Sequence, residues 1–124
     1  MSIQEGRGTK YPSIKPRIDE WEIEIQAPHI TTHIKDRWNE RTTDACSPRE
    51  AWVKGVEVTF LRQRPDFYSD ERGAPDRLRY YWDGSNEVVL VERNGVVTTV
   101  LLVSGLYDPV LRRTLRMLRE LVDQ

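Results

Sequence analysis

Two runs of β-branched and aliphatic residues, which together span Asn86 to Val103, meet at the dipeptide Asn94-Gly95. A two-residue hairpin turn needs a positive φ at both central residues, and Asn followed by Gly is the pair that accepts this conformation most readily. The stretch therefore predicts an antiparallel hairpin. This hairpin is the strongest local constraint on the fold, and the other elements are interpreted around it.

The turn also predicts the register of the two strands. Two hydroxyl side chains, those of Thr98 and Thr99, then lie in the middle of an otherwise apolar sheet. Neighbouring side chains of a regular strand point to opposite faces, so only one of these threonines can face a given site. The expected opposite pairs are Arg93 with Val96, Val91 with Thr98, and Leu90 with Thr99.

The residues before the hairpin show first a strand period and then a helical period. Alternation of apolar residues with glutamates over Trp21–Ile25 predicts a strand with one acidic face. Beyond Pro28, apolar residues recur every four positions and predict a helix from about Thr31 to Arg41. Ser47-Pro48-Arg49-Glu50 is a capping box with proline at the first helical position, and it predicts a second helix over Pro48–Lys54.

Two further strands and a terminal helix complete the expected order. The strands are expected at Val56–Phe60 and Leu78–Trp82, with an exposed loop over residues 63–76 between them. Asp108 is a credible N-cap for the last helix, and Pro109 suits its first turn. The apolar stripe of that helix consists of Leu111, Leu115, Leu118 and Val122, and the arginines 112, 116 and 119 lie on its other side.

These elements predict a single α+β domain. Its antiparallel sheet has about five strands in the order β-α-α-β-β-β-β, with the two early helices on one face and the C-terminal amphipathic helix docked alongside. Residues 1–17 mix glycine, proline and polar residues without a period, so we expect a flexible N-terminal arm, followed by one domain over residues 18–124.

Composition excludes several classes of protein. The formal net charge of -1 over 124 residues argues against coating nucleic acid by bulk charge, although a local basic patch remains compatible with it. Cys46 is the only cysteine, so no internal disulfide or thiolate cluster can form, and we expect a cytoplasmic protein. No run approaches the roughly 20 apolar residues that a membrane helix needs. We expect no cofactor, and the sequence does not indicate the oligomeric state.

The first predicted helix carries the candidate catalytic residues. His33, Arg37 and Arg41 recur every four residues and share one helix face, and we hypothesise that this face meets the hairpin hydroxyls. The alternative is a solvated face with local ion pairs to Asp36 and Glu40. A metal site formed by His29 and His33 is disfavoured, because Pro28 disturbs helical geometry at His29 and no third ligand is apparent.

Two other groups of residues are candidates for RNA contact. Arg77, Arg79 and Tyr81 combine cations with an aromatic ring on one predicted strand, which suits phosphate contact and base stacking. The alternative is that the aromatic residues of this strand belong to the core. Arg112 and Arg116 could contact phosphates, or could simply form the solvated side of the terminal helix.

The order of elements and two short motifs resemble the RelE-like and barnase-like fold of small RNase toxins. The first motif is a helix of the form His-x-x-x-Arg-x-x-x-Arg, here His33, Arg37 and Arg41. The second is a late strand written Val-Val-Thr-Val, which looks like Val97 to Val100. The resemblance spans about Trp21 to Val103.

The resemblance implies a metal-independent endoribonuclease, in which the ribose 2′-hydroxyl attacks the adjacent phosphate. It implies acid or base work for His33, phosphate stabilisation by Arg37 or Arg41, and hydrogen bonding by Thr99, which is preferred to Thr98 on its match to the family's strand ending. It also implies RNA as substrate and an antitoxin as possible protein partner. The alternatives are a non-catalytic module that binds RNA or a protein, and a structural subunit that uses the hairpin as an interface.

Overall fold

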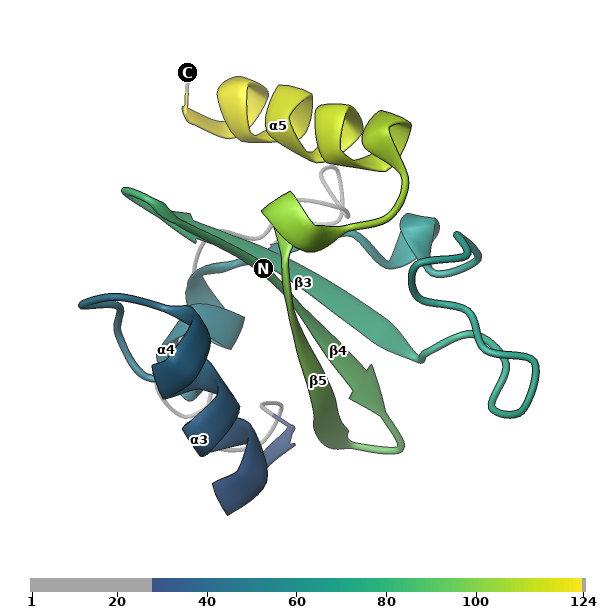
Figure 1. The fold of residues 1–124 in the computed structure, drawn as a ribbon, viewed down its shortest axis with the longest axis horizontal. Coiled ribbons are helices and arrows are strands. Elements are labelled where there is room, and N and C mark those ends of the chain that lie inside the picture. Colours follow the sequence, from purple (N-terminus) through teal and green to yellow (C-terminus); the bar gives the residue numbers. More distant parts are fainter. Residues whose placement is uncertain (1–27, 124) are drawn as a thin grey trace, which may run out of the picture.

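The computed structural model describes residues 28–123. The predicted arm 1–17 and the predicted strand Trp21–Ile25 lie outside the described residues. Within them the predicted α+β order is confirmed (Figure 1). The elements are β1 (His29–Ile30), α3 (Thr32–Arg41), α4 (Pro48–Lys54), β2 (Val56–Glu57), the 3-10 helix η2 (Thr59–Leu61), β3 (Arg77–Asp83), β4 (Asn86–Arg93), β5 (Val96–Leu102), the 3-10 helix η3 (Val103–Gly105) and α5 (Pro109–Asp123).

The five strands of the described part form one mixed sheet in the order β1-β5-β4-β3-β2. Strands β2 to β5 pair antiparallel, as expected. Strand β1 was not predicted, and it pairs parallel to β5, with His29 opposite Val96, so the expectation of a wholly antiparallel sheet is wrong. Parallel neighbours need a long crossover, and here the crossover consists of every element between β1 and β5.

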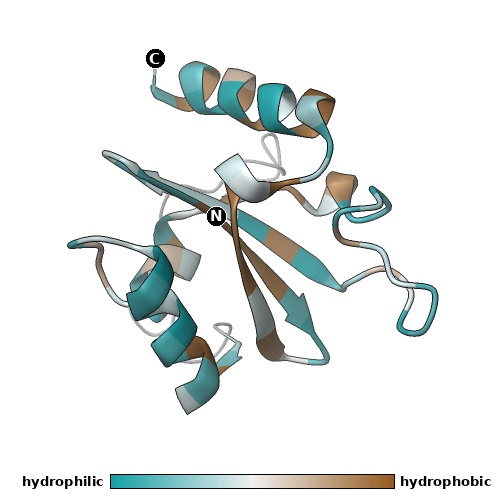
Figure 2. Cartoon of the chain, in the orientation of Figure 1, coloured by the Kyte–Doolittle hydropathy of each residue, from teal (hydrophilic) through white to brown (hydrophobic). Residues whose placement is uncertain are grey.

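Helices cover both faces of the sheet. On one face Ile34 and Trp38 of α3 and Trp52 of α4 pack against Leu90 and Val100, which confirms that the two early helices share a face. On the other face Leu111 and Leu115 of α5 pack against β3 and β4 residues such as Leu78 and Val89. Figure 1 shows α5 on one side of the sheet and α3 with α4 on the other. The sheet is therefore the middle of three layers, and α5 carries both hydrophilic and hydrophobic residues along its length (Figure 2).

The hairpin turn forms at Asn94-Gly95, with φ of 54° and 78°. Arg93 lies opposite Val96 as predicted, but the next part of the predicted register is wrong by one residue. Val91 lies opposite Thr99, and Leu90 lies opposite Val100. A β-bulge between Val91 and Glu92 causes the shift, because Thr98 is an extra residue with no opposite partner.

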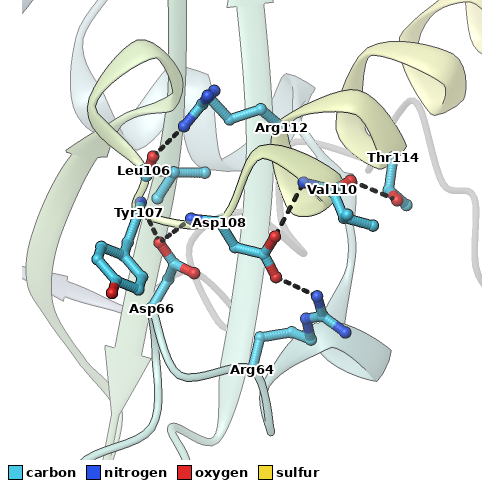
Figure 3. Close-up of polar contacts among 8 residues, drawn as sticks. All are labelled: Arg64, Asp66, Leu106, Tyr107, Asp108, Val110, Arg112 and Thr114. Atoms are coloured by element: carbon cyan, nitrogen blue, oxygen red, sulfur yellow. Dashed lines mark hydrogen bonds and ion pairs between the residues drawn. The ribbon is translucent and has the colours of Figure 1, made fainter.

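The segment after α4 and the start of α5 complete the framework. The predicted strand Val56–Phe60 is shorter than expected, because the ladder with β3 ends where Val58 N–H donates to the Leu78 carbonyl, and the chain then turns into η2. At α5 the predicted cap is confirmed, since Asp108 Oδ1 accepts a hydrogen bond of 2.8 Å from Val110 N–H (Figure 3).

No helix among residues 28–123 is both long and apolar enough to cross a membrane.

Candidate functional site

The predicted catalytic residues of α3 lie beside its buried face. Thr31 caps the helix, since its Oγ1 accepts a hydrogen bond of 3.2 Å from Ile34 N–H. Ile34 and Trp38 are buried against the sheet. His33 and Arg37 precede these two residues by one position each and are exposed. With Arg41 they form a line along one flank of the helix, which we call the α3 line.

Arg41 connects the α3 line to the hairpin. Strand β1 pairs with β5 only at Val96 and Val97, so the outer edge of β5 beyond Val97 has no strand neighbour in the described part of the chain. At this open edge the Val100 carbonyl accepts a hydrogen bond from Arg41 Nη1. The guanidinium thereby satisfies a backbone acceptor that a further strand would otherwise occupy.

The other two members of the α3 line remain accessible. Arg37 lies 3.4 Å from Glu40 Oε1, and both side chains are largely exposed, so this pair is weak. The pair of Arg37 with Glu40 is one of the local ion pairs expected if the α3 line is simply a solvated helix face. The His33 side chain makes no hydrogen bond within residues 28–123. The imidazole is therefore free to reach a ligand from solvent.

The hairpin threonines lie on the side of the sheet away from α3. Thr99 lines a hollow of about 380 Å³ with Val91 and Leu101, whereas Val97 and Val100 pack with α3 on the opposite face. No hydrogen bond joins either threonine to the α3 line within residues 28–123. The side chains of the two groups therefore approach one another only across the backbone of β5, at its open edge.

The bulge places Thr98 and Thr99 on the same side of the sheet. Thr98 lines a second hollow of about 560 Å³, and both hollows include Arg72 and Arg93. The extra residue interrupts the alternation of side chains, so Thr98 and Thr99 open to the same side of the sheet. The expectation that only one of them could face a given site is wrong for this reason. Thr98 Oγ1 also bonds the Val91 carbonyl at 3.4 Å, whereas the Thr99 hydroxyl makes no bond within the described residues.

Sequence reasoning missed the two arginines of these hollows. Arg93 donates to the carbonyls of Phe67, Arg72 and Gly73 at 3.1, 3.3 and 3.2 Å, and so fastens the loop of residues 63–76 to the hairpin. Arg72 lines both hollows as well. Its loop has no sequence period, and only a structure shows that the loop folds back over β5.

Arg77 and Arg79 lie against α4, and Tyr81 packs against Trp38 of α3. Arg79 and Tyr81 are only 2% and 5% exposed. The guanidinium carbons of Arg77 and Arg79 lie 5.3 and 5.4 Å from the centre of the Trp52 ring, and Arg77 pairs with Glu57 at 2.7 Å. Burial lowers the pKa of Arg79 and raises the pKa of Tyr81. Arg79 and Tyr81 are thus held inside the fold, as the core alternative expected for the aromatic residues, and they are not presented to RNA.

The predicted phosphate contacts of α5 are engaged with the domain itself. Arg112 donates to the Leu106 carbonyl, as Figure 3 shows. Arg116 pairs with Glu87 at 3.2 Å, and the same carboxylate accepts a hydrogen bond from Tyr80. Burial and this hydrogen bond raise the pKa of Tyr80. Arg112 therefore holds the start of α5 to the segment before it, and Arg116 joins α5 to β4, although its side chain stays half exposed.

The described residues offer no cluster for a metal ion. No group of three or more His, Cys, Asp and Glu side chains within residues 28–123 is arranged to hold one. His29 belongs to β1 and His33 to α3, so these two histidines do not have the helical spacing that a two-histidine site needs. Chemistry at the α3 line would rest on the imidazole and the guanidinium groups.

Comparison with known protein families identifies one match. The family model described as "Putative RelE superfamily toxin domain" matches residues 30–104, which is more than half of the chain and includes the α3 line, the sheet and both threonines. Searches of curated proteins and of solved structures gave no match. The chain therefore belongs to the family of RelE superfamily toxin domains.

Proposed function

We propose that this protein is a toxin that cleaves RNA without a metal ion, acting in the cytoplasm. In the proposed reaction the ribose 2′-oxygen bonds to the adjacent phosphorus and the 5′-oxygen of the next nucleotide leaves. The products carry a 2′,3′-cyclic phosphate and a 5′-hydroxyl. The observation that supports the site most directly is the Arg41 hydrogen bond to Val100, because it fixes the α3 line beside the open edge of β5.

The residue types of the α3 line suit this reaction. An imidazole changes protonation near neutral pH, so His33 can accept the 2′-proton or donate a proton to the leaving 5′-oxygen. The exposed Arg37 guanidinium can stabilise the negative charge that develops on the phosphorane oxygens. Arg41 is already bonded to the backbone, so we assign it to positioning and Arg37 to the phosphate.

The open edge of β5 provides a path for a single strand of RNA. A strand that crosses this edge would meet His33 and Arg37 on one side of the sheet and Arg72 with the Thr99 hydroxyl on the other. Charge attraction to the guanidinium groups would hold the phosphates, and the free hydroxyl could bond a base or a phosphate oxygen. An antitoxin would inhibit the protein by covering the same edge.

Paired histidine variants test the proposal. Purified protein is incubated with mixed RNA in excess chelator, alone and with ribosomes. We expect His33→Ala to abolish cleavage and Arg37→Ala to reduce it at least a hundredfold, since transition-state donors of this kind contribute about that much. His29→Ala is the matched control, because His29 is also exposed but lies on β1, and it should cleave normally. Equal loss in both histidine variants would contradict the assignment.

A second candidate function is a non-catalytic module that binds RNA or a protein on the same scaffold. One observation favours it: the neighbours of His33 on the α3 line are arginines, so the line holds a single imidazole and no second candidate for proton transfer. This candidate predicts that wild-type protein leaves RNA intact with and without ribosomes, while Arg37→Ala weakens binding of the same RNA.

A further inference from the structure

Helix α5 carries a second apolar stripe that does not face the sheet. Val110, Met117 and Leu121 are 50%, 60% and 65% exposed, and Thr114 lies among them. These residues follow one another at intervals of four, three and four positions, which is the spacing of a coiled-coil seam. We call these four residues the outer stripe. Helix α5 lies beyond residues 30–104, so the family match does not account for it.

Two unpartnered charges flank the outer stripe. Arg113 and Glu120 are exposed, lie seven residues apart and therefore share one flank of the helix. Neither makes an ion pair or a side-chain hydrogen bond within residues 28–123. The other three arginines of α5 do have partners, namely Leu106, Glu87 and, for Arg119, both Glu87 and the ring of Trp82. The charges beside the stripe are thus the ones left for an external partner.

We propose that the outer stripe is the interface between two copies of this chain, with the two α5 helices packed antiparallel about a two-fold axis near Met117. A two-fold axis places the same flank of both helices on the same side of the interface. Arg113 of each copy then lies opposite Glu120 of the other, which gives two identical ion pairs. Met117 meets its counterpart near the axis, and Val110 and Leu121 extend the apolar contact along both helices.

The pattern of charges favours this partner and this orientation. One positive and one negative side chain on the same flank complement a second copy, whereas a uniformly acidic or basic partner would place like charges opposite one another. In a parallel pair Arg113 would face the position of Leu118, which packs into the core of its own copy. Only the antiparallel pair therefore forms both ion pairs.

The expected dimer is weak. One helix from each copy buries less than the roughly 1,200–2,000 Å² of a standard stable interface. Sedimentation velocity of the full chain should show monomer and dimer in exchange at micromolar concentration. Arg113→Glu and Glu120→Arg should each raise the dissociation constant about tenfold, because each replaces two attractions by two repulsions.

Charge exchange provides the decisive comparison. An equimolar mixture of the Arg113→Glu and Glu120→Arg variants should associate as well as wild type, because both ion pairs form again between unlike copies. The double variant should likewise recover self-association. Arg62→Glu makes the same charge change at an exposed position outside α5 and outside the outer stripe, and it should leave the dissociation constant unchanged.

Three results would overturn the inference: a wild-type chain that stays monomeric up to millimolar concentration, a dimer that neither single variant weakens, or single variants that associate no better when mixed. Met117→Glu gives a second readout at the axis and should leave only monomer. Met117 is exposed, so this variant should retain the wild-type circular dichroism spectrum, and an unchanged dimer in it would equally exclude this interface.

Discussion

Arg41, the last residue of α3, donates a hydrogen bond to the backbone carbonyl of Val100, which lies 59 residues further along the chain. This bond joins the helix that carries His33 to the strand that carries Thr99. It lies at the edge of the sheet, where β1 no longer covers β5. The two short motifs of the sequence are therefore connected by a backbone contact and not by contact between their side chains.

Arg41 and Arg37 should respond differently to truncation. Arg41→Ala leaves the Val100 carbonyl without its charged donor, so we expect the free energy of unfolding to fall by about 1 kcal/mol, since water at the edge replaces part of the bond. Arg37→Ala should change it by less than about 0.5 kcal/mol, because its exposed pair with Glu40 contributes little. Urea denaturation of both variants measures the difference, and equal losses would contradict the structural role of Arg41.

Substitution of Thr98 should lower stability, whereas substitution of Thr99 should lower RNA binding or cleavage. Thr98→Val removes the hydroxyl that bonds the Val91 carbonyl at the bulge, and we expect a loss of about 0.5–1 kcal/mol in the free energy of unfolding. Thr99→Val removes a hydroxyl without a partner, so stability should be unchanged while RNA affinity or cleavage falls several-fold. Denaturation and RNA titration of each variant check this. The reverse pattern would assign the RNA contact to Thr98.

Local signals in the sequence predicted the elements well because each has a short-range cause. The Ser47-Pro48 capping box defined α4, Asp108 defined the start of α5, and Asn94-Gly95 defined the hairpin. The bulge at Thr98 could not be predicted, because no turn residue or glycine marks it. The fold of the loop that brings Arg72 to the hairpin depends on contacts between segments far apart in the chain, which a local period does not encode.

Dependence on contacts between distant segments also explains why the sequence assigned several buried or paired arginines to RNA contact. Arg77, Arg79 and Tyr81 occupy alternate positions of one strand, and the sequence is the same whether Arg79 is solvated or stacked on Trp52. The face of the sheet that α4 covers decides whether Arg79 is solvated or stacked. For α5 the helical period separated the buried stripe from the arginines, but it could not show that Arg112 and Arg116 reach back to the domain.

Arg93 should control the loop over the hairpin. Arg93→Ala removes the donor shared by three loop carbonyls, so the loop of residues 63–76 should detach while the sheet stays folded. We expect hydrogen exchange in this loop to accelerate at least tenfold, with protection of β3 and β4 retained. Arg93→Lys keeps the charge but not the planar fork, and it should give an intermediate rate. An unchanged loop in Arg93→Ala would contradict the clamp.

The cap of α5 should make stability depend on pH. The backbone N–H of Val110 and then the Arg64 guanidinium hold the pKa of Asp108 below its usual value (Figure 3). A lowered pKa in the folded state stabilises the protein above the ordinary aspartate pKa of about 3.9, and this contribution is lost as the pH falls through the lower folded value.

The comparison with Asp108→Asn measures this contribution. Asparagine can still accept the Val110 hydrogen bond but carries no charge. The urea midpoint of wild type should exceed that of the variant at pH 7, and the gap should close as the pH falls below 3.9. A gap that stays constant between pH 7 and pH 2 would show that the Asp108 charge does not contribute.

The most direct test of the proposed function is to identify the ends of RNA fragments made by the wild-type protein in excess chelator, in parallel reactions with and without ribosomes. The proposal predicts fragments with 2′,3′-cyclic phosphate and 5′-hydroxyl ends that are absent with His33→Ala and present with His29→Ala. A substrate with a 2′-deoxy sugar at the cleaved position should remain intact. Intact RNA in both reactions, or fragments with 3′-hydroxyl and 5′-phosphate ends, would contradict the proposed function.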